Sequence, residues 1–236
     1  MSSAPSRSDD PVGQVLTEAT DALRDDILAL GGPAPVILID GRSGAGKTSL
    51  TRLLLERWPL DASPQLLALD STYPGWDGLD AAVEDVTRHV LIPHAGGQQG
   101  RWRRWDWSTG EYAESHAVDA SLALVVEGSG ILTPTTAALA GIRVWVESPT
   151  DSRRERALER DGDTYRPHWE RWARQEDDHI ARDDPAAHAT HVAHIAQPLP
   201  TAAASSAEAT EVSDGAGTCE QRGRKTEKHA VQNAAL

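Results

Sequence analysis

The stretch "APVILIDGRSGAGKTSLTRLLLERW", residues 34–58, decides the fold of this 236-residue chain. It opens with a continuous apolar run over 34–40, which is typical of a strand buried on both faces of a sheet. A glycine-rich turn follows, and "TSLTRLLLERW" then has the apolar spacing of a helix. The sequence therefore predicts a unit in which a buried strand leads through a tight turn into a helix.

The turn "GRSGAGKT", residues 41–48, satisfies the pattern G-x-x-x-x-G-K-[ST] between a strand and a helix, as phosphate binding requires. Its glycines let successive backbone N–H groups point at phosphate oxygens, and the helix dipole adds positive charge. Lys47 is predicted to reach the β- and γ-phosphates of a nucleotide, and Thr48 to bind Mg²⁺ through its hydroxyl. Lys47 is also the only lysine before Lys225, which indicates a specific need for an ammonium group here. The predicted nucleotide-binding residues are Gly41, Arg42, Ser43, Gly44, Ala45, Gly46, Lys47, Thr48 and Ser49.

The alternation of strands and helices continues along the chain. Further strands are expected at 65–70, 121–128, 142–147 and 190–195, and helices at 12–30, 78–91, 133–140, 150–161 and 165–183. Residues 93–118 are expected to be irregular. This order predicts an α/β fold with a parallel sheet covered by helices on both faces.

Composition sets the limits of the domain. Residues 12–196 are expected to form it, preceded by a disordered leader at 1–11. Residues 197–236 are rich in Ala, Ser, Thr and Glu and poor in large apolar side chains, so a disordered tail is expected there.

Charge and cysteine content restrict the partners. The formal net charge of -13 argues against a nucleic acid or an anionic membrane as partner, because either would favour a basic face. No run of about 18 apolar residues is present to span a membrane. The single cysteine, Cys219, cannot form a disulfide framework or a cysteine-based zinc site, which fits a cytoplasmic protein. The oligomeric state stays open.

Two carboxylates are predicted at the ends of strands, where ligands gather in open α/β sheets. Glu127 ends "LALVVE" and is assigned to Mg²⁺, directly or through a bridging group. Asp70 ends "QLLALD" and is then free to act as the base that accepts a proton from an attacking hydroxyl. The converse assignment, in which Asp70 binds the metal and Glu127 is structural, remains open.

Aromatic and basic residues mark an acceptor region and a lid. Six of the eight tryptophans fall in segments that could line a pocket, or could pack a small subdomain: Trp76, Trp102, Trp105, Trp107, Trp169 and Trp172. Asp77 and Asp106 are candidates for binding acceptor hydroxyls, or for capping turns. The helix "TDSRRERALERD" carries Arg153, Arg154, Arg156 and Arg160, of which one or two are expected to neutralise phosphate charge while the others form a solvated face.

The segments "GRSGAGKTSL", "LDSTYPG", "VVEG" and "DSRRERALERD", in this order, resemble the uridine kinase-like branch of the P-loop kinases. The resemblance covers roughly residues 34–195. It implies a P-loop NTPase fold with a five-stranded parallel sheet, the cofactors ATP and Mg²⁺, and transfer of the γ-phosphate to a nucleoside 5′-hydroxyl.

The resemblance also assigns roles to single residues. It places Asp70 on the catalytic aspartate, with Thr72 where the family has phenylalanine, and Asp77 near the ribose-binding aspartate. It implies that the acceptor and lid segments are about 71–118 and 150–184. It matches Trp105 and Asp106 to the family's Tyr-Asp-Phe stretch, and Arg153, Arg156 and Arg160 to its lid arginines. Taking residue patterns and resemblance together, the residues predicted to bind the acceptor are Tyr73, Trp76, Asp77, Trp105, Asp106 and Arg153, and those predicted for catalysis are Lys47, Asp70, Arg156 and Arg160. Residues 93–118 lack the family's base-reading pattern, so the acceptor does not follow from the resemblance.

The sequence thus predicts an ATP- and Mg²⁺-dependent kinase of a small molecule, with a nucleoside or nucleoside-like alcohol as the leading acceptor. One alternative is a nucleotide or sugar-acid kinase on the same sheet. Another is a regulatory module that binds ATP and transfers nothing, although an acceptor base and an arginine lid favour transfer.

Overall fold

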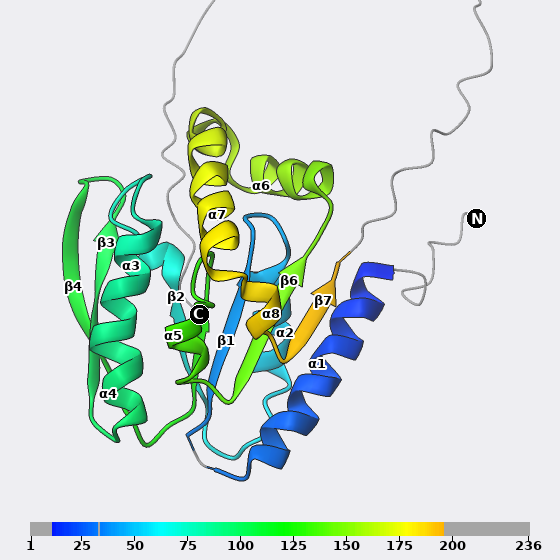
Figure 1. The fold of residues 1–236 in the computed structure, drawn as a ribbon, viewed down its shortest axis with the longest axis vertical. Helices are drawn as coiled ribbons and strands as arrows, with labels where there is room; N and C mark the ends of the chain where they lie inside the picture. Colours follow the sequence, from blue (N-terminus) through cyan, green and yellow to red (C-terminus); the bar gives the residue numbers. More distant parts are fainter. Residues whose placement is uncertain (1–10, 33, 196–236) are drawn as a thin grey trace, which may run out of the picture. The chain divides into compact units, whose positions relative to one another are not determined.

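The computed structural model describes residues 11–32 and 34–195, and its centre is a parallel sheet with helices on both faces (Figure 1). The sheet has five strands in the order β2-β5-β1-β6-β7, and every neighbouring pair is parallel. The strands are β1 (Val36–Gly41), β2 (Gln65–Ala68), β5 (Leu124–Glu127), β6 (Ile142–Glu147) and β7 (His191–His194). The predicted fold class is confirmed. The predicted tail, and all but the last residue of the predicted leader, lie outside the described residues.

The apolar runs of the central strands are explained by two hydrophobic cores, one on each face. In β1, Ile37 and Ile39 face one core while Val36 and Leu38 face the other. The first core also takes side chains from α1 (Pro11–Leu30) and α2 (Lys47–Glu56). The second takes side chains from α3 (Leu79–Val86) and α7 (Trp169–Asp183). A strand with no solvent-facing side needs apolar residues at every position.

Shorter helical elements complete this layer arrangement. A π-helical turn (Thr87–Leu91) joins α3 to α4 (Ile92–Ala95), and α5 (Pro134–Ala137) follows β5. The helix α6 (Thr150–Tyr165) leads through a 3₁₀ turn (Arg166–His168) into α7, and α8 (Pro185–His188) precedes β7. In Figure 1, α6 and the start of α7 rise above the upper end of the sheet, beyond the end of β1.

The expectation that 93–118 is irregular was wrong. Residues 100–118 form an antiparallel hairpin of β3 (Gly100–Asp106) and β4 (Glu111–Val118), which lies apart from the main sheet (Figure 1). The hairpin turns at Gly110, whose φ of +69° lies in the left-handed region that glycine adopts easily. Cross-strand pairs stabilise it, including Trp102 stacked on His116 and Trp105 against Tyr112.

The second strand also ends earlier than predicted. Hydrogen bonding to β5 stops at Ala68, and Asp70 lies in a 3₁₀ turn (Leu69–Ser71) just beyond the sheet. Moreover, β5 lies between β1 and β2. Glu127 is therefore on the strand next to β1, which leads into the glycine-rich loop of residues 41–48 (the predicted phosphate loop), and Asp70 is one strand further away. The order of the sheet therefore separates the two carboxylates along its carboxyl edge.

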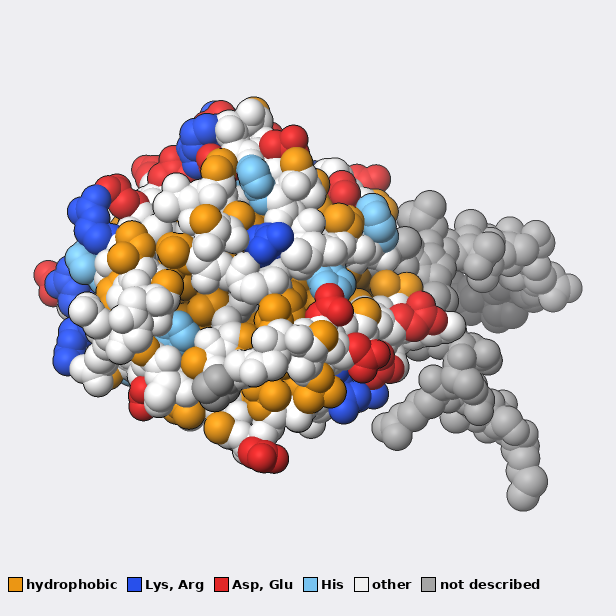
Figure 2. All heavy atoms as spheres, turned by 60° about the horizontal axis from the view of Figure 1, so that its bottom comes forward, with side chains coloured by type: hydrophobic (Ala, Val, Ile, Leu, Met, Phe, Trp, Pro, Cys, Tyr) orange, Lys and Arg blue, Asp and Glu red, His pale blue; other side chains and the backbone are white. Residues whose placement is uncertain are grey.

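The opposite end of the molecule has a different surface. Figure 2 turns the lower end of Figure 1 toward the viewer and shows scattered hydrophobic side chains among neutral ones, with charged side chains mainly at the margins. Exposed large apolar residues of the described chain include Leu28, Leu30, Leu66 and Ile92. Among residues 11–32 and 34–195, no helix is long and apolar enough to cross a membrane.

Candidate functional site

Lys47, the first residue of α2, lies at the centre of the phosphate loop and is 9% exposed. Its ammonium group donates hydrogen bonds to the carbonyl oxygens of Gly41 at 2.8 Å and Arg42 at 3.2 Å. A third contact joins it to the hydroxyl of Ser129 at 3.3 Å. These contacts hold the charged nitrogen inside the curl of the loop, where it can meet a bound phosphate.

Two glycines allow the backbone of the loop to curl tightly. Gly44 and Gly46 have φ values of +75° and +109°, which other residues rarely adopt. A Cβ atom at Gly44 would lie 2.1 Å from the carbonyl oxygen of Arg153, and one at Gly46 would lie 2.7 Å from Cδ1 of Ile195. The loop is thus packed closely between α6 and the end of β7, as expected of a backbone cradle for phosphate.

The lid arginines have different surroundings. Arg153 is buried and donates to the carbonyl oxygens of Ser148 at 3.1 Å and Ser43 at 3.2 Å. Arg156 donates to the carbonyl oxygen of Gly44 at 2.8 Å. These two arginines therefore brace the phosphate loop from outside. Arg154 is exposed on the same helix.

Arg160, in contrast, is exposed and forms an ion pair with its neighbour Asp161. The hydrogen bond with Asp161 raises the pKa of Arg160, desolvation opposes this, and the negative charge of Asp70 raises it further. The charge of Arg160 in turn lowers the pKa of Glu127.

Two oxygen ligands suited to Mg²⁺ lie next to each other beside the phosphate loop. The hydroxyl of Thr48 donates to Oε1 of Glu127 at 3.1 Å. Burial raises the pKa of Glu127, the charge of Asp70 raises it further, and Lys47 and Thr48 lower it. Within residues 11–32 and 34–195 no cluster of three or more His, Cys, Asp or Glu residues could hold a metal by itself. A hydroxyl and a carboxylate fit Mg²⁺, which prefers oxygen ligands and takes the rest from nucleotide phosphates and water.

Asp70 is exposed, and its backbone is contacted by a residue of the hairpin turn. The indole N–H of Trp107, just after β3, donates to the carbonyl oxygen of Asp70 at 3.0 Å. Trp107 also contacts Trp76, with ring centroids 4.8 Å apart. The 3₁₀ turn that contains Asp70 is therefore joined to the tip of the hairpin, and the Asp70 side chain remains exposed to solvent.

Trp76 is the centre of an aromatic cluster that joins the loop after Asp70 to the lid. Its ring stacks on His168 with centroids 4.3 Å apart and on Tyr165 with centroids 5.5 Å apart. Tyr165 in turn contacts Trp169, and Trp172 contacts Tyr73 edge to face. Most of the aromatic residues singled out in the sequence thus pack on one another here, between α7 and residues 71–79, the segment after Asp70 that we call the acceptor loop.

The other predicted acceptor residues have partners of their own. The Tyr73 side chain is buried, and its hydroxyl donates to the carbonyl oxygen of Ser129 at 2.9 Å. Asp77 forms a two-pronged ion pair with Arg171. Trp105 packs against Tyr112 across the hairpin, and the Asp106 carboxylate accepts hydrogen bonds from Ser108 in the turn. The structure therefore brings Lys47, Thr48, Glu127 and Asp70 to one edge of the sheet, and gives Tyr73 and Arg153 buried positions.

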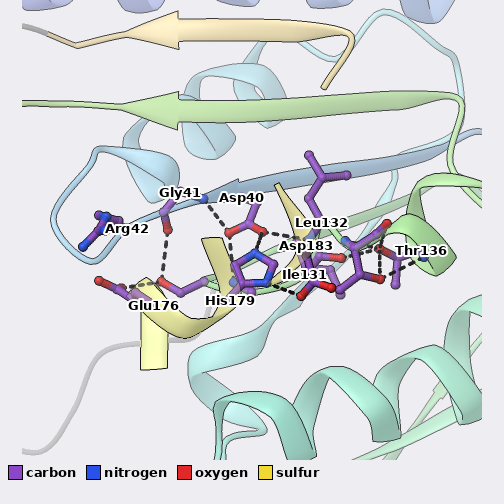
Figure 3. A network of polar contacts seen from close by, with 12 residues as sticks. Asp40, Gly41, Arg42, Ile131, Leu132, Thr136, Glu176, His179 and Asp183 are labelled. Carbon is purple, nitrogen blue, oxygen red and sulfur yellow. Dashed lines mark hydrogen bonds and ion pairs between the residues drawn. The ribbon is translucent and has the colours of Figure 1, made fainter. Parts of the chain in front are cut away.

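Asp40, immediately before the phosphate loop, is a buried polar centre that the sequence analysis did not identify (Figure 3). Its carboxylate accepts from the backbone N–H groups of Gly41, Gly130 and Leu132 at 2.6–2.9 Å. It also contacts Nε2 of His179 at 3.1 Å, while Nδ1 of His179 contacts Asp183 at 2.9 Å. Both imidazole nitrogens face carboxylates, so the arrangement favours the doubly protonated ring.

This network predicts a pH dependence of stability. Burial lowers the pKa of His179, but the hydrogen bonds and charges of Asp40 and Asp183 outweigh it, and the net pKa lies above the ordinary 6.5. The stabilisation is complete below pH 6.5 and is lost as pH rises through the raised pKa. His179→Leu should therefore lower the unfolding free energy most at about pH 6 and less at about pH 9.

Urea unfolding at the two pH values measures this difference. His89→Gln is the control, because His89 is exposed and its imidazole contacts Asp85, four residues earlier in the chain. A loss of stability in His179→Leu that is the same at both pH values would contradict a charged His179.

Ser129 and Glu176 are further residues that the sequence analysis missed. Ser129 follows β5, and its hydroxyl lies 3.0 Å from both the carbonyl oxygen of Gly41 and Oε1 of Glu176. Glu176, on the buried face of α7, accepts from the backbone N–H of Ser43 at 2.6 Å. Together with Arg153 and Arg156 of α6, Ser129 and Glu176 thus hold the phosphate loop from three separate segments, and Glu176 lies 133 residues beyond Ser43.

A cavity of about 520 Å³ adjoins the outer side of the phosphate loop. Its walls include Arg42 and Arg153, the end of β6, and residues of α7 and α8 around Asp177 and Asp184. No residue of the loop after Asp70 lines this cavity, and of residues 41–48 only Arg42 does.

Comparison with solved structures supports the fold. A protein described as a possible uridine kinase from Bacillus stearothermophilus is 18% identical, with a TM-score of 0.56 over 75% of this chain and 98% of that chain. A protein provisionally described as a fructose transport system kinase from Silicibacter sp. is 16% identical, with a TM-score of 0.52 over 76% of this chain and 98% of that chain. No protein-family model matches the sequence, and no curated protein matches it. The chain therefore has the fold of the uridine kinase-like and related P-loop kinases, over nearly the whole length of these neighbours.

Proposed function

We propose that this protein is an ATP- and Mg²⁺-dependent kinase that transfers the γ-phosphate to a hydroxyl group of a nucleoside or nucleoside-like acceptor. One observation carries the proposal: a buried Lys47, a Thr48–Glu127 pair and an exposed Asp70 follow one another along the carboxyl edge of the sheet. A site that only binds a nucleotide needs the first two of these features. The third supplies what phosphoryl transfer to an alcohol requires.

Each residue has a separate task in this reaction. The loop amides and Lys47 bind and orient the phosphates, and Thr48 and Glu127 would hold Mg²⁺. That ion, when bound, neutralises phosphate charge. Asp70 accepts the proton of the acceptor hydroxyl, and Arg160 stabilises the charge that develops on the transferred group. Arg153 and Arg156 keep the loop in place from outside, through its carbonyl groups.

The division between metal and acceptor carboxylates follows from the sheet order. Glu127 is on the strand next to β1 and contacts the hydroxyl of Thr48 directly, whereas Asp70 is one strand further out and exposed. This arrangement favours Glu127 for the metal and Asp70 for the acceptor. The single cysteine and the net charge of -13 fit a cytoplasmic enzyme that acts on a small molecule.

The function can be tested by measuring ADP formation with MgATP in the presence of a library of nucleosides and sugars, with product masses confirmed. Sugars are included because one structural neighbour is described as a kinase of a fructose transport system. We expect one class of alcohol to stimulate ADP formation and to gain the mass of one phosphoryl group. ATP binding without stimulation by any acceptor would instead favour a regulatory module.

Glu127→Gln tests the metal assignment. The amide keeps the size of the side chain and can still accept from Thr48, but it loses the negative charge that attracts the cation. We expect the Mg²⁺ concentration for half-maximal turnover to rise about 10–100-fold, with a smaller effect at saturating Mg²⁺. Glu111→Gln, in the exposed part of β4, is the matched control. An unchanged Mg²⁺ requirement in Glu127→Gln would assign the metal to Asp70.

A further inference from the structure

The helix α7 contacts both sides of the proposed reaction. Its residues Glu176 and Asp177 contact Ser43 and Arg42 of the phosphate loop. Its residues Arg171 and Gln175 contact Asp77 and Trp76 in the loop after Asp70, and Arg182 contacts Asp80 in the first turn of α3. The structure therefore contains one rigid element that touches the donor site and the acceptor loop at once.

Glu176 is placed where it can fix the phosphate loop. Only 2% of its surface is exposed, and its Oε1 accepts from three donors: the N–H of Ser43 at 2.6 Å, the hydroxyl of Ser129 at 3.0 Å and the indole N–H of Trp172 at 3.1 Å. The Ser129 hydroxyl has one hydrogen, for which Glu176 and the carbonyl oxygen of Gly41 compete at the same distance of 3.0 Å, and its oxygen accepts from the ammonium of Lys47 at 3.3 Å. Glu176 thus acts on Lys47 through Ser129, and on the loop backbone directly.

Gln175, the preceding residue, holds the acceptor loop. Its amide N–H donates to the carbonyl oxygen of Trp76 at 2.8 Å, and its amide oxygen accepts from the N–H of Leu79 at 3.4 Å. One side chain therefore binds both a donor and an acceptor of the backbone between Trp76 and Leu79. Because Gln175 and Glu176 are adjacent on the same helix, the contacts to the backbone at 76–79 and to Ser43 come from neighbouring residues of one element.

We propose that Gln175 and Glu176 form a mechanical link through which the acceptor loop positions the phosphate loop, so that Glu176 is a positioning residue for Lys47. The link rests on the proposed function, because it connects a loop proposed to bind the acceptor with a loop proposed to bind the phosphates of ATP. It gives α7 a role beyond packing: the acceptor loop must be in place before the phosphate loop has its full order.

Hydrogen–deuterium exchange of the full chain tests the link without an acceptor. The peptide covering 41–48 is compared with a reference peptide covering 142–147, in the buried strand β6, which reports global stability. Gln175→Met keeps the length of the side chain and removes its hydrogen bonds to the acceptor loop. It should speed exchange in 41–48 by roughly fivefold to tenfold, the size expected for one lost hydrogen bond, and leave 142–147 unchanged.

Variants at Glu176 and a matched control complete the test. Glu176→Ala should speed exchange in 41–48 at least as much, and Glu176→Gln should restore part of the protection, because its amide oxygen still accepts from Ser43. Asp178→Asn removes a carboxylate from the same helix at an exposed position and should change neither peptide. The affinity for MgAMP-PNP should be lowest in the variant whose 41–48 peptide exchanges fastest, and should rank the other variants in the same way.

Two results would overturn the link. One is exchange in 41–48 that is faster in Glu176→Ala but unchanged in Gln175→Met, which would make Glu176 a local support with no connection to the acceptor loop. The other is exchange that rises equally in 41–48 and 142–147. Failure of the wild-type protein to bind MgAMP-PNP would instead overturn the proposed function, while the exchange rates would still decide whether the link exists.

Discussion

Lys47→Ala is expected to reduce phosphoryl transfer by at least roughly 10²–10³-fold, because it removes a fixed positive charge from the place where phosphate charge develops. The ammonium is almost buried and is held inside the loop by Gly41, Arg42 and Ser129, so its charge lies where the phosphates are expected to bind. Initial rates of ADP formation with a saturating acceptor measure the effect.

The fold must be checked separately, since the same ammonium holds two loop carbonyls. Lys47→Met keeps most of the apolar stem and serves as a second variant that lacks the charge. Arg52→Ala is the control for loss of a cation on the same helix, because its side chain is 77% exposed and lies outside the loop. Circular dichroism and thermal unfolding should be close to wild type for all three. A folded Lys47 variant with near-normal transfer would refute the assignment of the phosphate loop.

The curled loop between β1 and α2 was predictable from the sequence because its geometry is local. Gly44, Gly46 and Lys47 lie within one turn, and their spacing is the pattern that predicts phosphate binding. The parallel sheet was predictable for a similar reason, since each buried strand has its own apolar run. The hairpin at 100–118 was missed because polar and apolar residues do not alternate regularly along its first strand, where the pairing register shifts between Arg103 and Trp105. Gly110 does mark its turn.

The contacts of α7 could not be predicted, because they depend on which distant segment each side chain meets. The sequence does contain a signal: Trp172, Glu176, His179 and Asp183 recur at the spacing of one helical face. Three polar residues on a face that otherwise packs inward indicate buried polar partners. Only the fold shows that these partners are Ser43, Ser129 and Asp40. The order of the strands is equally non-local, and it decides that Glu127 is nearer than Asp70 to the phosphate loop.

Asp70→Asn is expected to lower phosphoryl transfer by roughly 10²–10⁴-fold, the usual contribution of a general base. The amide keeps the shape of the side chain but cannot accept the proton of an attacking hydroxyl. Because Asp70 is exposed and the hydrogen bond from Trp107 goes to its backbone carbonyl, the substitution should leave the fold unchanged. Asp61→Asn, at an exposed position before β2, is the matched control.

Measuring both the affinity for MgATP and the transfer rate of Asp70→Asn separates three mechanisms. If Asp70 is the base, transfer falls and MgATP affinity stays near wild type, since Lys47, Thr48, Glu127 and the loop amides are intact. If Asp70 holds the metal, MgATP affinity falls together with transfer, and Glu127→Gln has the weaker effect of the two on the Mg²⁺ requirement. If the protein is a regulatory module, no acceptor stimulates the wild type, and Asp70→Asn leaves slow ATP hydrolysis unchanged. The position of Asp70 favours the first outcome. Asp70 follows the strand beyond Glu127, and Glu127 contacts Thr48, so Asp70 can meet an acceptor hydroxyl while Glu127 keeps its place beside Thr48.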